Sequence, residues 1–211
     1  MEKDEKQLTL KDGRSGIQPV TGLRNGDALI IVDVQNDFLP GGSLQVPRGD
    51  EIIPVINHYI ALFEEASFPI IATRDWHPQN HCSFEVLGGP WPVHCVAGTQ
   101  GAEFPPDLRF PPDTILVSKA TTPDKDAYSG LDGTGLDQQL RSMGIKRVFV
   151  GGLATDYCVL STVKDLLKQG YSVVLLKDAV RAVDLHPGDG EKALREMESL
   201  GALTTSLEDI T

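Results

Sequence analysis

Short apolar runs alternate along the chain with longer segments in which apolar residues recur three or four positions apart. Runs rich in β-branched residues and bounded by turn residues are typical of buried strands. They predict five strands, at 28–34, 69–74, 114–119, 147–151 and 172–177. Residues 202–206 are a candidate for a sixth strand. Segments with helical spacing predict helices between most of these strands: 50–66, 134–143, 157–168 and 190–200.

This alternation predicts an α/β fold, a mainly parallel sheet with helices on both faces. A chain of 211 residues suits one such core better than two small ones, so we expect a single domain over 27–211. Residues 1–26 are charged and contain no apolar run of the kind found in secretory signals, which predicts a loose N-terminal extension. The proline-rich stretch 76–113 interrupts the alternation, and a loop of this length in a compact domain is usually functional.

Reactive side chains stand at the ends of four predicted strands. The first strand leads to Asp33, the second to Asp75 and the third to Lys119, and the fourth leads through two glycines to Cys158. Because ligand sites of open parallel sheets lie beyond the carboxyl ends of the strands, we expect these four side chains to share one site.

Cys158 lies near the predicted start of a helix that Thr155 or Asp156 could cap. Unpaired N–H groups and the helix dipole at that position favour a thiolate, although most free cysteines are simply small buried apolar residues. Asp33 and Lys119 supply what a cysteine nucleophile needs, a base for the thiol proton and a fixed positive charge. The alternative for these two residues is a purely structural buried ion pair.

Candidate metal ligands gather in the proline-rich loop. Asp75 and His77, two positions apart at a strand end, project to the same side, His94 offers a third ligand, and His81 is a candidate fourth. A single loop histidine is commonly just solvated, but three within this loop beside a strand-end aspartate indicate a Zn²⁺ or Fe²⁺ site. We do not expect Cys82 and Cys95, each adjacent in sequence to one of these histidines, to face the same ion.

The remaining composition narrows the class of ligand and the compartment. A net charge of −11 opposes binding to nucleic acid or to an anionic membrane and suits a small neutral or cationic ligand. Phe38, Trp91 and Tyr128 follow the first three strands; each alone is more typical of core packing, but together they could wall a flat aromatic substrate. Three cysteines are too few for a disulfide scaffold, which favours a reducing compartment, here the cytoplasm.

Six motifs in order resemble the nicotinamidase branch of the isochorismatase-like cysteine hydrolases, and the resemblance runs from about Asp27 to the C-terminus. They are DVQNDF with GGSL (33–38 and 41–44), RDWHPQNHCSF (74–84), GGPWPVHCVAGTQGAEF (88–104), the strand end at Lys119, DAYSG (126–130) and GGLATDYCV (151–159). Each motif alone would be weak, whereas their joint occurrence is specific.

The resemblance implies a three-layer α/β/α fold with a six-stranded, mainly parallel sheet. It implies a catalytic triad of Asp33, Lys119 and Cys158, and an oxyanion hole formed by the Ala154 and Cys158 N–H groups after a cis Leu153–Ala154 bond. The implied metal ligands are Asp75, His77 and His94, while His81 is a ligand in only some members. The implied pocket residues are Phe38, Leu44, Trp91 and Tyr128.

The reaction implied by the resemblance is hydrolysis of nicotinamide to nicotinate and ammonia through a cysteine thioester, as part of NAD salvage. The implied metal, Zn²⁺ first with Fe²⁺ or Mn²⁺ as alternatives, would hold the pyridine nitrogen and water. Two alternatives stay open: a related amidohydrolase for another small amide, and a relative that binds nicotinamide with little catalysis. Homo-oligomer formation is also open, since no residue decides it.

Overall fold

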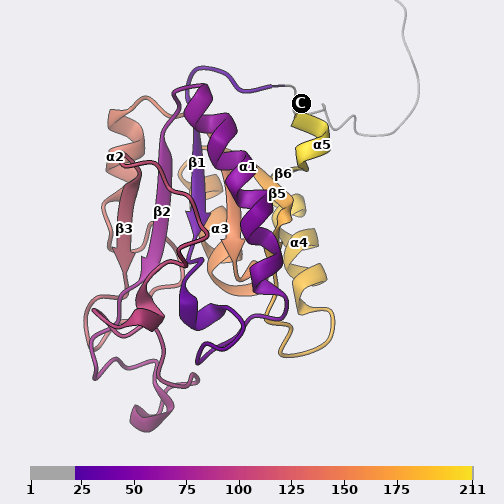
Figure 1. Ribbon diagram of the computed structural model, residues 1–211. Helices are drawn as coiled ribbons and strands as arrows, with labels where there is room; N and C mark the ends of the chain where they lie inside the picture. The colour runs from indigo at the N-terminus through magenta and orange to yellow at the C-terminus, as the bar shows by residue number, and fades with distance from the viewer. Residues whose placement is uncertain (1–21, 211) are drawn as a thin grey trace, which may run out of the picture.

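A computed structural model describes residues 22–210, so most of the predicted N-terminal extension, residues 1–21, lies outside the described part. Six strands form one sheet in the order β3-β2-β1-β4-β5-β6, and every neighbouring pair is parallel (Figure 1). The strands are β1 Asp27–Val32, β2 Ile70–Asp75, β3 Ile115–Lys119, β4 Arg147–Leu153, β5 Ser172–Arg181 and β6 Leu203–Thr205. The predicted α/β fold and its sixth strand are confirmed.

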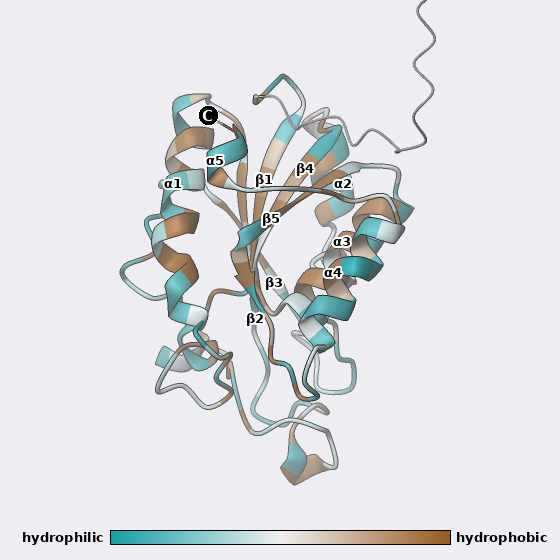
Figure 2. Ribbon diagram, turned by 90° about the vertical axis from the view of Figure 1, so that its right-hand side faces the viewer, coloured by the Kyte–Doolittle hydropathy of each residue, from teal (hydrophilic) through white to brown (hydrophobic). Residues whose placement is uncertain are grey.

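Helices cover both faces of the sheet, which gives the molecule three layers (Figure 2). Helices α1 (Ile52–Glu65) and α5 (Leu207–Ile210) lie on one face, and α2 (Leu136–Ser142), α3 (Leu160–Lys168) and α4 (Asp189–Ser199) lie on the other. None of the helices in this part of the chain is long and apolar enough to cross a lipid bilayer.

The central strand β1 is buried along its whole length because both of its faces are covered. Leu29 and Ile31 join the apolar cluster beneath α1, whereas Ala28 and Ile30 join the cluster beneath α2 and α3. This two-sided burial explains why the strand reads as a continuous apolar run rather than as an alternating one.

Strand β5 and helix α5 differ most from the sequence-based expectation. Strand β5 runs to Arg181, beyond its predicted end at 177, because the polar residue Asp178 finds partners inside the fold. The Asp178 carboxylate accepts hydrogen bonds from the Tyr59 hydroxyl at 2.9 Å and from the Leu207 N–H at 3.0 Å. The bond to Leu207 fixes the start of α5, a short helix that periodicity could not reveal.

The strand order reverses beside β1, which pairs with β2 on one side and with β4 on the other. In sheets of this kind the crevice outside the carboxyl ends of the strands at such a reversal is the usual ligand site. The long loop between β2 and β3 lies beyond these carboxyl ends, at the lower left of Figure 1, where it can cover that crevice.

At the amino ends of the strands, Arg147 and Asp27 form a buried ion pair with bonds of 2.8 Å and 2.6 Å. We expect Asp27→Ala to lower the free energy of unfolding by about 3 to 5 kcal/mol, since it leaves a buried guanidinium without its counter-charge. Urea denaturation measures this difference. Asp132→Ala, which breaks an exposed pair with Lys125, is the control and should cost less than about 1 kcal/mol. Equal losses for both variants would contradict the interpretation.

Candidate active site

Three of the four predicted strand-end residues arrive side by side through the strand register. Asp75 and Lys119 are the last residues of β2 and β3 and are paired across the sheet. Asp33 directly follows β1, and its N–H donates to the Thr73 carbonyl at 3.1 Å. All three side chains are buried, which makes their mutual distances important for stability as well as for chemistry.

The Lys119 ammonium joins these carboxylates to the cysteine. Its Nζ lies 2.9 Å from Asp33 Oδ2, 2.5 Å from Asp75 Oδ1 and 3.5 Å from Cys158 Sγ, and it donates to the Ala127 carbonyl at 3.0 Å. The sequence-predicted group of Asp33, Asp75, Lys119 and Cys158 is therefore assembled in one place. A buried carboxylate, an ammonium and a thiol in contact can move a proton and stabilise the thiolate that results.

Asp33 is fixed so that only one of its oxygens faces this group. Thr73 Oγ1 donates to Asp33 Oδ1 at 2.6 Å, and the Asp33 backbone has the left-handed φ of 49°. Asp33 Oδ2 is buried and accepts no hydrogen bond with good geometry from the described residues, although the Lys119 charge is close. This oxygen is the one available to take a proton from the thiol.

Burial controls the protonation of the group. It raises the pKa of Cys158 well above the usual thiol value, and the Lys119 charge only partly offsets this effect. Burial likewise raises the pKa of Asp33 against the lowering effect of Lys119. Burial alone would lower the pKa of Lys119, but Asp33 and Asp75 outweigh it, so the ammonium stays charged. The resting cysteine is thus a thiol, because desolvation outweighs the thiolate preference expected at a helix start.

The cysteine sits in an unusual turn after β4. The Leu153–Ala154 peptide bond is cis, as the resemblance implied, and residues Thr155–Val159 form a π-helical turn before α3 begins. Gly152 has a φ of 122°, and an added β-carbon there would overlap the backbone of Val32 in β1. Glycine is required at this position because the turn packs directly on the neighbouring strand.

The expectation that Thr155 or Asp156 caps the helix through its side chain is wrong. Ala154 occupies the N-cap position, and no side-chain capping bond is formed. The Asp156 carboxylate instead accepts the N–H groups of Val183 and Asp184, each at 2.9 Å. Asp156 therefore ties the cysteine turn to the segment after β5.

Asp75, His77 and His94 form a second group, with ligand atoms that all lie within 4.8 Å of one another. His77 Nδ1 lies 3.2 Å from the Ala120 carbonyl, which leaves its buried Nε2 without a hydrogen-bond partner among the described residues, 3.8 Å from Asp75 Oδ2. In His94, Nδ1 lies 2.7 Å from the Pro92 carbonyl, so this carbonyl contacts Nδ1 and not Nε2. Two imidazoles and a carboxylate converging around an orphaned nitrogen fit a divalent metal ion with open positions.

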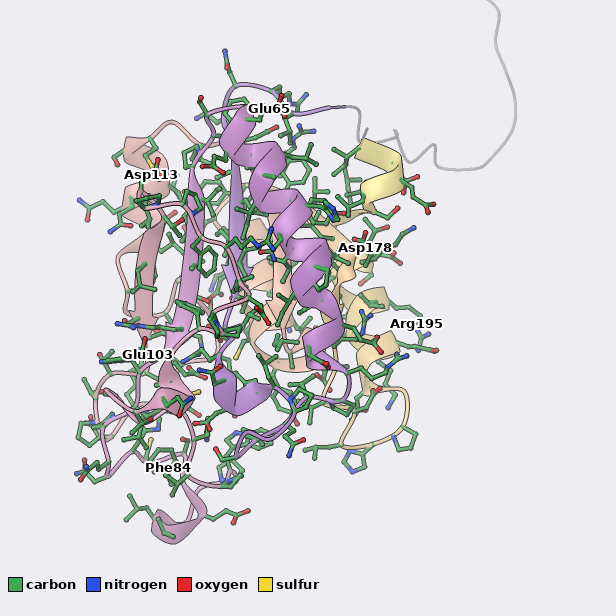
Figure 3. The ribbon with its side chains drawn as sticks, viewed as in Figure 1. Glu65, Phe84, Glu103, Asp113, Asp178 and Arg195 are labelled. Atoms are coloured by element: carbon green, nitrogen blue, oxygen red, sulfur yellow. The ribbon has the colours of Figure 1, made fainter. Side chains whose placement is uncertain are left out.

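The protonation state of His77 also favours a metal site. Burial, followed by the neighbouring rings of His94 and His81, lowers the pKa of His77 to about 3. The imidazole is therefore neutral at physiological pH, and the neutral form is the one that binds a metal. Phe84, labelled in Figure 3 in the loop beyond the strand ends, packs edge-on against both His77 and His94 at 5.7 Å.

His81 lies beside this group and outside it. Its ring stacks on His77 with centroids 4.1 Å apart, and its two nitrogens contact Ser83 Oγ at 2.7 Å and the Lys125 carbonyl at 3.2 Å. Among the described residues, the group of mutually close ligand atoms that includes imidazoles consists of Asp75, His77 and His94.

An apolar pocket connects the two groups. Its lining includes Cys158 and Ala154 on one side and Asp75 and His94 on the other. The sequence-predicted pocket residues line it as well: Phe38, Leu44, Trp91 and Tyr128. A ligand in this pocket would touch the thiol and the candidate metal ligands at once.

Aromatic contacts fix the pocket walls. The Trp91 indole N–H donates to the Tyr128 hydroxyl at 2.9 Å, and the Trp91 ring meets Tyr157 edge-on at 5.0 Å. Sequence reasoning missed four residues of the lining: Val46, Leu153, Tyr157 and Val183. Tyr157 could have been found from its place beside Cys158, whereas Val183 reaches the pocket only because β5 is longer than predicted and Asp156 holds the next segment.

The raised pKa of Cys158 predicts how this thiol reacts. Alkylation by iodoacetamide should be slow at neutral pH and should accelerate through the alkaline range as the thiolate forms. Lys119→Met should move this acceleration to still higher pH, because Lys119 lowers the thiol pKa. Mass spectrometry of the peptide that contains Cys158 measures the rate. Lys125→Met, which changes an exposed lysine, is the control, and maximal alkylation of the unchanged protein at pH 6 would refute the prediction.

Comparisons with known proteins place the chain in a family. The family model described as the isochorismatase domain matches residues 27–209. The nicotinamidase of Escherichia coli (strain K12) is 38% identical over 203 residues, which cover 86% of this chain and 95% of that protein.

Two solved structures extend the similarity to three dimensions. A pyrazinamidase of Pyrococcus horikoshii in complex with zinc is 53% identical, with a TM-score of 0.83 over 86% of this chain and 99% of the other. PnC1 from L. infantum in complex with nicotinate is 39% identical, with a TM-score of 0.84 over 92% and 99% of the two chains.

Proposed function

The chain belongs to the isochorismatase family, and from this premise we propose that it is a nicotinamidase, which hydrolyses nicotinamide to nicotinate and ammonia. The observation that carries the proposal is the single pocket shared by the thiol of Cys158 and the group of Asp75 and His94. The activity named for the E. coli relative supports the substrate, and the nicotinate bound to the L. infantum protein supports the product.

Substrate binding would use the walls of the pocket. The flat pyridine ring of nicotinamide would lie between Phe38, Trp91 and Tyr128, of which Trp91 and Tyr128 are joined by a hydrogen bond and Phe38 packs against His94. Such packing orients the carboxamide toward Cys158 and excludes water from the reacting atoms. Leu44 closes the apolar wall beside Phe38.

The first chemical step would be transfer of the Cys158 proton to Asp33 Oδ2 as sulfur attacks the carboxamide carbon. A carbon–sulfur bond forms, and the carbonyl π electrons move to oxygen. Lys119, 3.5 Å from the sulfur, stabilises the negative charge that desolvation makes costly. The N–H groups of Ala154 and Cys158 are the proposed donors to the developing oxyanion.

In the second step Asp33 returns the proton to the departing nitrogen, and the carbon–nitrogen bond breaks to release ammonia. The product on the enzyme is a thioester between Cys158 and the nicotinoyl group. Water then attacks this thioester while Asp33 takes one of its protons, and Asp33 returns that proton to the departing sulfur as the carbon–sulfur bond breaks. This gives the thiol and nicotinic acid, which loses its proton to solvent or to ammonia and becomes nicotinate. One water is consumed for each nicotinamide.

We assign the metal site to Asp75, His77 and His94, with Zn²⁺ expected first and Fe²⁺ or Mn²⁺ as alternatives; the zinc complex of the P. horikoshii protein supports this order. A divalent ion held there would supply a Lewis-acid contact for the pyridine nitrogen and for water. The protein contributes the orientation of the ligands, because Asp75 Oδ1 is held by Lys119 and only Oδ2 faces His77.

Replacement of the nucleophile tests the proposal. Cys158→Ala should reduce ammonia release from nicotinamide to background while leaving the bound metal unchanged, since Cys158 is not among the three proposed ligands. A coupled ammonia assay and elemental analysis of the same sample measure the two quantities. Cys82→Ala, at a cysteine outside the pocket lining, should keep both. Substantial ammonia release by folded Cys158→Ala would sink the mechanism.

A further inference from the structure

Asp37 takes no part in the proposed reaction, yet its carboxylate contacts several segments around the pocket. It lies in the short 3₁₀ turn Asn36–Phe38 after β1. Its Oδ2 accepts the Cys95 N–H at 2.7 Å, and its Oδ1 accepts the Ser43 N–H at 3.3 Å. Its backbone carbonyl also accepts the N–H of Leu44, a pocket residue, at 2.9 Å.

The bond to Cys95 restrains the residue that follows the candidate ligand His94. Cys95 is fully buried and has a φ of 46°, a left-handed conformation that is unfavourable for a residue with a β-carbon. Its N–H is held by Asp37, and its carbonyl accepts the N–H of His77 at 3.0 Å. The turn at Cys95 is thus fastened between Asp37 and the other histidine of the candidate metal group.

The shape around Asp37 is equally specific. A β-carbon added at Gly101 would overlap the Asp37 carboxylate, and one added at Gly42 would overlap the carbonyl oxygens of Asn36 and Asp37. The next residue, Phe38, places its ring 5.7 Å from the His94 ring. The Asp37 carboxylate therefore fits closely against Gly101 and between the N–H groups of Ser43 and Cys95. The adjacent Phe38 ring packs against His94, the candidate metal ligand.

We propose that Asp37 is a positioning residue for the metal site: by holding the Cys95 turn, it aims His94 at Asp75 and His77, and it joins this ligand to the pocket wall at Leu44. The inference rests on the proposed metal-dependent function. It assigns to Asp37 no contact with substrate or metal. Partners that orient metal ligands in this way typically change metal affinity by about 10- to 100-fold when removed.

The test is the affinity of the metal-free protein for Zn²⁺, measured by competition with a chromophoric chelator. Asp37→Ala should weaken binding by about 10- to 100-fold, and Asp37→Asn, which keeps the size and one acceptor, should weaken it less. Asp50→Asn is the matched control. Asp50 and Asp37 line one surface hollow, and Asp50→Asn removes the same charge as Asp37→Asn. Its affinity should equal that of the unchanged protein.

Gly101→Ala provides a second variant in case Asp37→Ala does not fold. Its added methyl group must displace the Asp37 carboxylate without altering the charge, so it too should weaken Zn²⁺ binding. Unchanged affinity in folded Asp37→Ala or Gly101→Ala would overturn the inference, as would an equal loss in Asp50→Asn. Because Zn²⁺ binding is measured without substrate, a protein that binds Zn²⁺ but releases no ammonia from nicotinamide would refute the proposed function alone.

Discussion

The site depends on the Lys119 ammonium, which lies between the carboxylates of Asp33 and Asp75. Without this charge, the buried Asp33 carboxyl and Cys158 thiol would both favour their neutral, protonated forms. The ammonium stabilises negative charge on these buried groups. Its contact with Cys158 would also stabilise a transient thiolate. Because Asp75 faces Lys119 with one oxygen and His77 with the other, the group of Lys119 and Cys158 and the candidate metal group share this residue.

The parallel sheet makes this arrangement possible. Register pairs Asp75 with Lys119, and the reversal of strand order beside β1 brings Asp33 and the turn after β4 to the same edge. Close packing of that turn on β1 requires Gly152, whose hydrogen faces the backbone of Val32. The long loop then returns over the strand ends and adds His77, His94 and Trp91. Phe38, Tyr128 and Tyr157 reach the pocket from the segments after β1, β3 and β4. The strand ends thus carry the charged groups, and the segments that follow them form the pocket walls.

The sequence alone predicted the parts of the fold that follow from local pattern. Apolar runs located the strands, and the rule that sites lie beyond strand ends brought together Asp33, Asp75, Lys119 and Cys158. Local sequence pattern could not predict contacts between segments that are far apart in the chain. Asp156 reads as a helix cap but bonds the segment after β5, and no local pattern connects Asp37 with Cys95. The dominance of burial over the helix dipole at Cys158 also depends on packing that only the folded chain supplies.

In the proposed mechanism, one pocket uses a cysteine and a metal ion on the same substrate. It is tested most directly by ammonia release from nicotinamide, measured before chelation, after verified metal removal, and after Zn²⁺, Fe²⁺ or Mn²⁺ is restored separately. We expect activity to disappear with the metal and to return with a divalent ion. Full activity of the metal-free protein would contradict it.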